Sequence, residues 1–206
     1  MALHREDVIE AALDLLDEVG LDKLTTRALT TRLGVAPGAL YWHVKSKAEL
    51  LSAIADRIMR EAYGTPGNAT DDAPGDWVEQ TTAFAHRTRR AMLARRDGAR
   101  VVAGHLPLTA AALDASEAGL ALLRATGLPL AQAAYFGHTV ASYVTGFALQ
   151  EQAAPTPAPD LPAIEPERYP HMAAWAAEKP AEKDAAFTAG LALIIGGLRA
   201  ELAADA

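Results

Sequence analysis

The segment from Leu24 to Leu51, LTTRALTTRLGVAPGALYWHVKSKAELL, constrains this chain more than any other part of it. Apolar residues recur at helical intervals between Thr25 and Leu33, behind a threonine pair that suits a helix N-terminus. Gly34 can adopt the left-handed conformation that ends a helix, and Pro37 suits the first turn of the next one. Two short helices joined by a turn of a few residues form a helix-turn-helix.

Two further helices are predicted around this motif. Apolar residues at i, i+3, i+4, i+7, i+8 and i+11 predict a helix over residues 5–19 with one apolar face. Ser46 and Glu49 have the spacing of a capping box, which predicts a helix over residues 47–63. Residues 1–63 are therefore expected to form a small helical domain.

Positive charge is concentrated in the helix-turn-helix. Residues 23–47 contain five Lys or Arg and no Asp or Glu, a net charge of +5, whereas the whole chain carries −7. Residues 1–63 contain eight Lys or Arg and ten Asp or Glu, a net charge of −2. The charge is thus a local patch that can neutralise phosphates on an acidic protein, the alternative being a merely solvated surface. The five cations are Lys23, Arg27, Arg32, Lys45 and Lys47.

Short sequence motifs resemble one family of bacterial transcription regulators, the tetracycline-repressor (TetR) family. They are TTR, LGV, LYWHVK and the following K and LL within residues 20–51, then RDGARV at 96–101, GHLP at 104–107 and LALIIGGL at 191–198. The resemblance implies an all-α fold. In that fold an N-terminal three-helix helix-turn-helix DNA-binding domain is joined by a fourth helix to a larger helical ligand-binding and dimerisation domain.

The resemblance also implies roles for single residues of the motif. Thr26 and Arg27 correspond to positions that reach DNA from the first helix of the pair. Arg27 could read a guanine edge with two hydrogen bonds or hold a phosphate. Tyr41, His43 and Lys47 match positions that contact backbone phosphates.

The tip of the recognition helix departs from the family pattern. Pro37, Gly38 and Ala39 replace the polar side chains that tetracycline repressors use to read bases. Because these three cannot form bidentate hydrogen bonds, specificity is expected to depend on Arg27, on apolar contact with thymine methyl groups and on DNA shape. Trp42 is counted with the DNA-binding residues, although a large aromatic at this spacing favours packing of the recognition helix onto its supports. We predict a different operator from that of tetracycline repressors.

The rest of the chain is predicted to be a second helical domain. Residues 64–75 combine Gly, Pro, Asn and Asp, which disfavour helix, and are expected to be a linker between domains at 1–63 and 76–206. Residues 153–180 contain seven prolines and are expected to be a flexible excursion or a disordered connector, with at most a short helix near 172–179. No alternating run indicates a strand, and helices are predicted over residues 77–95, 109–126, 130–152 and 182–202.

The last predicted helix, over residues 182–202, is apolar around much of its circumference. The resemblance implies that it pairs with the helix over 130–152 in a four-helix bundle across a twofold axis. A homodimer is also expected because one short recognition helix reads few base pairs, whereas two read a palindromic operator on double-stranded DNA. The alternative is an intramolecular core.

The resemblance places the predicted ligand site in the second domain. At positions where tetracycline repressors hold a magnesium ion with the drug, this chain has Val102, His105 and Gln150, a poor set for a hard cation. A hydrophobic inducer such as an aromatic polyketide or a drug-like molecule is expected instead, with Gly119 and Gly137 leaving room for it. For each histidine the alternative is a satisfied core residue. The predicted ligand-binding residues are Tyr63, Phe84, His86, Thr88, Val102, His105, Leu106, Pro107, Gly119, Leu123, Gly137, His138, Ser142 and Gln150.

Ligand binding is expected to shift the population away from the DNA-binding state, with the helix over residues 47–63 carrying the motion. The alternative function is a ligand-independent dimeric DNA-binding regulator. No catalytic or metal-binding motif and no cysteine is found, so neither an enzyme nor a cofactor is expected. The acidic N-terminus is unlike a signal peptide and the apolar run at 185–198 is short for a bilayer, so a soluble cytoplasmic protein without membrane partners is expected.

Overall fold

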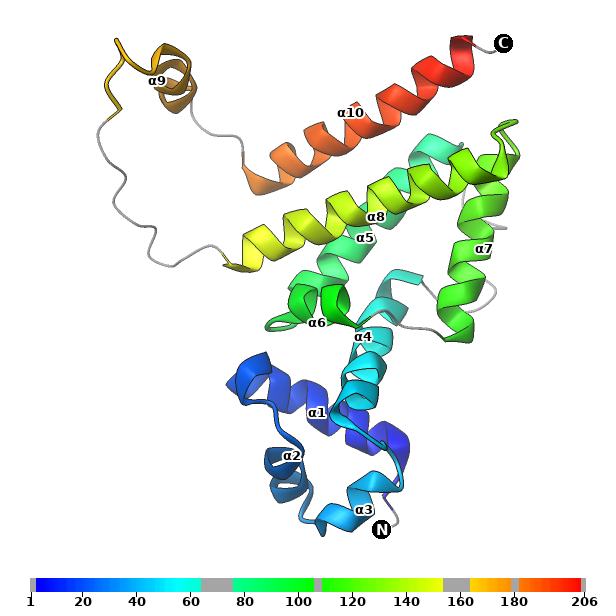
Figure 1. Ribbon diagram of the computed structural model, residues 1–206, viewed down its shortest axis with the longest axis vertical. Helices are drawn as coiled ribbons and strands as arrows, with labels where there is room; N and C mark the ends of the chain where they lie inside the picture. The colour runs from blue at the N-terminus through cyan, green and yellow to red at the C-terminus, as the bar shows by residue number, and fades with distance from the viewer. Residues whose placement is uncertain (1–2, 64–75, 106–108, 154–163, 179–181, 205–206) are drawn as a thin grey trace. The chain divides into compact units, whose positions relative to one another are not determined.

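The computed structural model describes residues 3–63, 76–105, 109–153, 164–178 and 182–204 (Figure 1). Within these ranges all regular structure is helical, which confirms the all-α prediction. The elements are α1 (Arg5–Val19), the 3-10 turn η1 (Leu21–Lys23), α2 (Thr26–Leu33), α3 (Pro37–Tyr41), α4 (Lys47–Tyr63), α5 (Trp77–Leu93), α6 (Gly98–Gly104), α7 (Ala110–Arg124), α8 (Leu130–Ala153), α9 (Pro170–Ala177) and α10 (Lys183–Ala204).

The helix-turn-helix forms where its caps predicted it. The Thr25 hydroxyl accepts a hydrogen bond from the Ala28 N–H and so caps α2. Gly34 ends that helix at φ 66°, in the left-handed region that glycine adopts without a steric penalty. Pro37 occupies the first turn of α3, and Leu40 is fully buried beneath that helix.

The capping box predicted for α4 forms in an altered version. The Ser46 hydroxyl accepts from the Glu49 N–H, as expected. The Glu49 carboxylate, however, accepts from the N–H of Lys45 rather than from that of Ser46. This backbone hydrogen bond is the main reason why the pKa of Glu49 is lowered, with Arg5 adding to the effect.

Helix α6 was not predicted. Its start is set by Asp97, a non-glycine residue at φ 55°, followed by Gly98. A Cβ atom on Gly98 would lie 2.3 Å from the carbonyl oxygen of Met92, so only glycine fits this close turn between α5 and α6. The predicted helices at 77–95 and 109–126 are each slightly shorter in the structure, where they are α5 and α7.

The described chain divides into two compact units, at residues 1–152 and 153–206. In the first unit, α4 packs against α1 on one side and against α5, α6 and α7 on the other. Its apolar core is one cluster that includes Leu16 of α1, Ile54 of α4, Met92 of α5 and Val101 of α6. The predicted division at residues 63 and 75 stays a prediction, and the linker at 64–75 lies outside the described residues.

The second unit contains α9 and α10. Helix α9 largely coincides in sequence with the short helix predicted near residues 172–179. Most of the proline-rich stretch before it is outside the described residues. Helix α10 is longer than the apolar run read from the sequence, and by length and composition it could cross a membrane. Its Leu193 side chain is 79% exposed in the single chain.

Candidate nucleic-acid interface and its connection to the larger helical domain

Most of the predicted DNA-binding residues, which lie on or next to α2 and α3, are exposed. Arg27 on α2, Gly38 on α3 and Lys47 at the start of α4 are all exposed. Tyr41 is 51% exposed, whereas its neighbour Leu40 is fully buried and anchors the recognition helix. Exposed cations and a phenol around one short anchored helix can contact phosphates and base edges. Of the other predicted residues, Pro37 is exposed and Thr26, Ala39 and His43 are half-buried.

The prediction that Trp42 packs the recognition helix onto its supports is wrong. Its side chain is 89% exposed. The packing role is filled by Leu40 and Val44, which lie on the opposite side of this turn and are buried in the core. Since α3 ends at Tyr41, Trp42 follows the last turn of the helix, where the helical spacing used in the sequence argument no longer applies. Trp42 is therefore an accessible aromatic next to the predicted DNA-binding residue Tyr41.

Fewer cations of the basic patch are free than the five counted in the sequence. Arg32 donates two hydrogen bonds to the Glu18 carboxylate, at 2.7 and 2.8 Å, and lies 3.7 Å from Asp14. The pKa of Arg32 is raised, first by the hydrogen bond to Glu18. Its charge is thus compensated within residues 3–63, the helix-turn-helix domain, which we call the head. Among the described residues no ion pair involves Arg27 or Lys47, so these cations remain available to phosphates.

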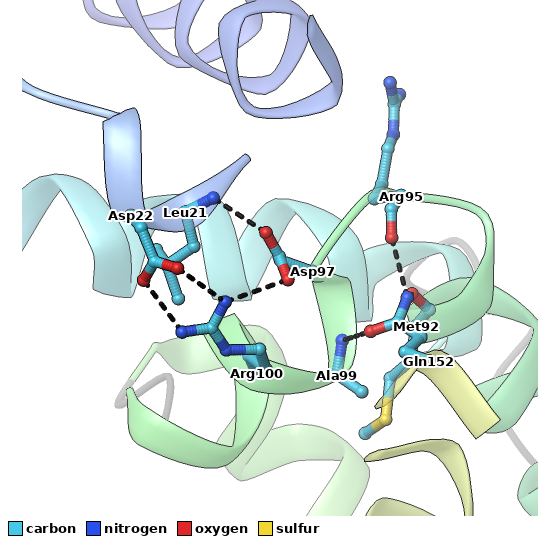
Figure 2. Close-up of polar contacts among 8 residues, drawn as sticks. All are labelled: Leu21, Asp22, Met92, Arg95, Asp97, Ala99, Arg100 and Gln152. Carbon is cyan, nitrogen blue, oxygen red and sulfur yellow. Dashed lines mark hydrogen bonds and ion pairs between the residues drawn. The ribbon is translucent and has the colours of Figure 1, made fainter. Parts of the chain in front are cut away.

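A cluster of polar contacts connects this head to α6 (Figure 2). The Asp97 carboxylate accepts a 2.8 Å hydrogen bond from the Leu21 N–H with one oxygen and a 3.0 Å bond from Arg100 with the other. Arg100 also donates to the Asp22 carboxylate at 2.9 Å, which lowers the pKa of Asp22. We call Leu21, Asp22, Asp97 and Arg100 the joint. It ties the turn after α1 directly to the first turn of α6.

Further contacts strengthen the connection beside the joint. Asp17 of α1 accepts from the Arg95 guanidinium at 2.8 Å and from the Arg96 N–H at 2.9 Å. A Cβ atom on Gly20 would lie 3.0 Å from the Asp97 carboxylate and 3.1 Å from Arg96, so α1 approaches this turn closely. The C-terminal end of α1 and the α5–α6 turn are therefore in direct contact at several points.

Gln152, near the end of α8, holds the other side of the α5–α6 turn (Figure 2). Its side-chain oxygen accepts from the Ala99 N–H at 3.0 Å. Its amide nitrogen donates to the carbonyl oxygens of Met92 and Arg95, at 3.1 and 2.8 Å. One side chain thus bonds to three backbone groups at the boundary between α5 and α6, where the Arg95 carbonyl also accepts from the Gly98 N–H at 3.0 Å.

A second contact connects α4 to α7. The buried carboxylate of Asp56 accepts from the Thr109 hydroxyl and, at 2.8 Å, from Arg60. Thr109 also caps α7, since its hydroxyl accepts from the Ala112 N–H. Helix α4 therefore contacts α7 through a fixed polar bridge as well as through apolar packing.

The predicted ligand-binding residues are brought together only in part. The rings of Tyr63 and Phe84 lie parallel, with centroids 6.5 Å apart and planes 7° apart, and Arg87 lies over Phe84. Burial raises the pKa of the Tyr63 phenol, and the charge of Asp56 adds to this. Thr88 is buried one turn after Phe84 on the same face of α5. Tyr63 of α4 and Phe84 of α5 thus form an aromatic contact between these helices, which we call the wall.

The other predicted ligand residues differ in burial. Val102 and Leu123 are buried, His86, His105 and Gly119 are half-buried, and Gly137, His138, Ser142 and Gln150 are exposed. Leu106 and Pro107 lie outside the described residues. A Cβ atom on either Gly119 or Gly137 would meet nothing within 4 Å.

The joint and Gln152 were not predicted as functional. For Asp97 a signal existed, because an Asp–Gly pair indicates a turn, but the sequence does not show what that turn contacts. Asp22 and Arg100 are separated by 77 intervening residues, and no periodicity connects them. Gln150 and Gln152 are the same residue type two positions apart, so the sequence does not distinguish their roles. Of the two, Gln152 is the one that forms the hydrogen bonds to the α5–α6 turn.

The fold and this surface define a helix-turn-helix DNA-binding protein whose head is tied to a larger helical domain. Two family models match the chain. One, for bacterial regulatory proteins of the tetR family, matches residues 8–54, and the other, for the tetracyclin repressor-like C-terminal domain, matches residues 69–202. The chain belongs to the TetR family of bacterial transcription regulators.

Individual relatives are similar over almost the whole chain. The class A tetracycline repressor from transposon 1721 of Escherichia coli is 40% identical over 200 residues, covering 95% of this chain and 90% of the relative. The Streptomyces coelicolor protein ActR, solved in complex with actinorhodin, is 30% identical with a TM-score of 0.84, covering 98% of this chain and 99% of that one. BioQ, solved with its double-stranded DNA operator, is 32% identical with a TM-score of 0.69, covering 96% and 99%.

Proposed function

We propose that this protein is a repressor that binds a palindromic operator as a homodimer, with one α3 in each of two successive major grooves. The observation that carries the proposal is the set of exposed side chains on and next to α2 and α3, above all the unpaired Arg27 on α2 and the exposed Tyr41 and Trp42. The BioQ–operator structure supports it, because that protein has the same fold. Pro37, Gly38 and Ala39 offer no bidentate hydrogen bonds, so Arg27 is the direct reader of a base edge.

The homodimer is proposed from helices that expose large apolar side chains. Leu193 on α10 and Tyr135 on α8 are 79% and 71% exposed, so both helices have large apolar side chains available to a second copy. In our proposal these helices meet their counterparts in a second copy. In this proposal α10 is long and apolar because it is buried between subunits, and the protein works in the cytoplasm without a membrane partner.

We propose further that a hydrophobic small molecule releases the operator. The parallel Tyr63 and Phe84 rings support an aromatic polyketide or a drug-like molecule, and ActR binds actinorhodin on a similar fold. A magnesium–tetracycline complex is not proposed, although tetracycline repressors are relatives. Val102 has no oxygen ligand, the His105 ring nitrogen is within 3.2 Å of the Val101 carbonyl, and Gln150 is exposed and uncharged.

The signal is proposed to travel by two routes. Helix α4 runs from the head to the wall formed by Tyr63 and Phe84, so a ligand there acts directly on α4. The second route passes through Gln152, the start of α6 and the joint. A ligand that changes operator affinity about a hundredfold requires a coupling free energy of about 2.7 kcal/mol, within the usual range for allostery.

Catalysis is not part of the proposal. Among the described residues no group of three His, Asp or Glu side chains could hold a metal ion. The buried polar side chains other than Thr88 have structural partners: Arg89 pairs with Glu151, and Asp56 accepts from Thr109. No cofactor is proposed.

The test is selection of bound duplexes from a random DNA pool, repeated with candidate inducers. We expect a palindromic consensus with half-sites about one helical turn apart, and loss of binding in the presence of an aromatic inducer. A protein that stays monomeric, or that binds no duplex at low salt, contradicts the proposal. Operator binding that no inducer changes favours the ligand-independent dimeric regulator instead.

Substituting Arg27→Ala should weaken operator binding by about tenfold to a hundredfold, as expected for loss of one bidentate base contact. Arg32→Ala is the matched control, because Arg32 lies on the same helix α2 and its guanidinium is already paired with Glu18. Its operator affinity should stay within about twofold of that of the unsubstituted protein. Fluorescence anisotropy at one fixed salt concentration measures both. Equal losses in the two variants would show that only net charge matters at this surface.

Substituting Arg100→Ala should weaken communication rather than binding. The joint loses the ion pairs to Asp22 and Asp97, so a ligand should change operator affinity about threefold to tenfold less than in the unsubstituted protein. Arg57→Ala, which breaks an exposed ion pair with Glu10 inside the head, is the control. Operator affinity is measured with and without inducer for each variant. An unchanged ligand effect in Arg100→Ala removes the joint from the proposed signal route.

A further inference from the structure

The hydroxyl of Thr88 on α5 is buried without a hydrogen-bond partner. Among the side chains of the described residues it is the one buried polar atom in this state, and Thr88 as a whole is 5% exposed. Leaving a buried hydroxyl unpaired costs about 1–3 kcal/mol. Such a group therefore indicates either a defect in packing or a position that a bound molecule completes.

Three other helical hydroxyls in the described part of the chain each have a hydrogen-bond partner. A threonine or serine inside a helix usually donates to the carbonyl oxygen four residues earlier. Thr31, Ser116 and Thr139 do so, at 3.0, 2.8 and 2.8 Å. The corresponding acceptor for Thr88 is the Phe84 carbonyl, and no such bond forms. The Thr88 hydroxyl is thus not satisfied by its own helix.

The surroundings of Thr88 are flat and aromatic. Phe84 lies one turn earlier on the same face of α5, and the Tyr63 ring from α4 is parallel to it within 7°. Arg87 lies over the Phe84 ring, 5.9 Å from its centroid, and donates to the Ala62 carbonyl at 3.2 Å. The raised pKa of Tyr63 reflects the removal of water from this place. Such aromatic surfaces favour contact with planar apolar groups.

Arg89, the residue after Thr88, is committed to Glu151 in a buried ion pair. Its charge is therefore compensated before any ligand arrives. Arg89 therefore offers no countercharge to an ionised ligand group, and the other cation in this region, Arg87, lies over the Phe84 ring and donates to the Ala62 carbonyl. The threonine hydroxyl can both donate and accept, so it suits a neutral oxygen.

We propose that Thr88 is the polar anchor of the ligand site, and that the ligand is a planar aromatic molecule with a neutral phenol or carbonyl oxygen directed at this hydroxyl. The inference rests on the proposed function, because it assumes that the larger helical domain binds a small molecule. It goes further in naming the group that selects the ligand and the chemistry selected.

The first test compares β-naphthol with naphthalene, which differ by one hydroxyl, in fluorescence titrations of the full-length protein and its Thr88→Val variant. The variant keeps the shape of the side chain and removes the hydroxyl. It should bind β-naphthol about five- to tenfold more weakly and naphthalene within about twofold of the unsubstituted protein. Equal effects on the two probes, no effect on either, or no binding of β-naphthol to the unsubstituted protein overturns the inference.

The second test needs no ligand. Because Thr88→Val removes an unpaired buried hydroxyl, it should raise the melting temperature by about 3 °C. Thr30→Val is the matched control, since Thr30 is equally buried but donates to the Arg27 carbonyl at 2.9 Å. That variant should melt at the same or a lower temperature. A lower melting temperature for Thr88→Val shows that the hydroxyl is satisfied inside the protein, and overturns the inference.

The two proposals can fail separately. Operator binding by the unsubstituted protein is measured without either probe, and its absence contradicts the proposed function. If the operator is bound but the preference for β-naphthol does not depend on Thr88, only the anchor is wrong.

Discussion

Replacing Arg89 with methionine should lower the free energy of unfolding by about 3–5 kcal/mol. Arg89 on α5 and Glu151 on α8 are joined by two hydrogen bonds of 3.0 Å, and their side chains are only 8% and 14% exposed. Arg89 also lies 5.5 Å over the Phe147 ring. The substitution leaves the Glu151 carboxylate buried without its main counterion, and that desolvated charge is the source of the loss. Urea unfolding followed by circular dichroism measures it.

Two further variants test this explanation. The double variant Arg89→Met with Glu151→Leu removes both charges, so it should recover most of the lost stability. Arg57→Met breaks an exposed ion pair with Glu10 and should cost less than about 1 kcal/mol. A double variant as unstable as Arg89→Met would mean that packing around the guanidinium, rather than the unpaired carboxylate, determines the loss.

Replacing Gly98 with alanine should cost about 2–3 kcal/mol of stability. The new Cβ atom would lie 2.3 Å from the Met92 carbonyl oxygen and 3.2 Å from the Arg95 Cβ atom. Since the first of these is a backbone atom, the α5–α6 turn itself must shift. That turn carries the hydrogen bonds of Gln152 and adjoins Asp97, so the ligand effect on operator affinity should fall as well.

Gly104→Ala is the matched control for this variant. Gly104 ends the same helix, α6, and a Cβ atom there would meet nothing within 4 Å. Because alanine favours helix over glycine, this variant should be neutral or more stable by up to about 1 kcal/mol. Thermal unfolding of both variants compares them directly. Equal destabilisation would show that helix α6 tolerates no added methyl group, and that the contact at Met92 is not the cause.

The motif helices could be predicted because their signals are local. Thr25, Gly34, Pro37 and Ser46 each act on backbone groups within a few residues, and all four occupy the helix ends that their chemistry indicates. The exposure of Arg27 also follows from its place on the polar side of α2.

The sequence argument failed where an outcome depends on distant residues. The sequence alone suggests that Arg32 is a phosphate-binding cation. In the structure its guanidinium is paired with Glu18, fourteen residues earlier in the chain. Trp42 was expected to pack, but α3 ends one residue before it. The predicted ligand residues on α8 were read from resemblance alone, and Gln150 is exposed whereas Glu151 and Gln152 contact α5 and the α5–α6 turn.

By itself the sequence determined the helices, their caps and the position of the DNA-binding head, because hydrophobic periodicity and capping depend on residues three or four apart. Only the tertiary structure decided which charges are free, what the Asp97–Gly98 turn contacts and that the Thr88 hydroxyl is unpaired. Each of these outcomes is set by atoms far apart along the chain. Whether such groups meet depends on how the helices pack, which no local pattern encodes.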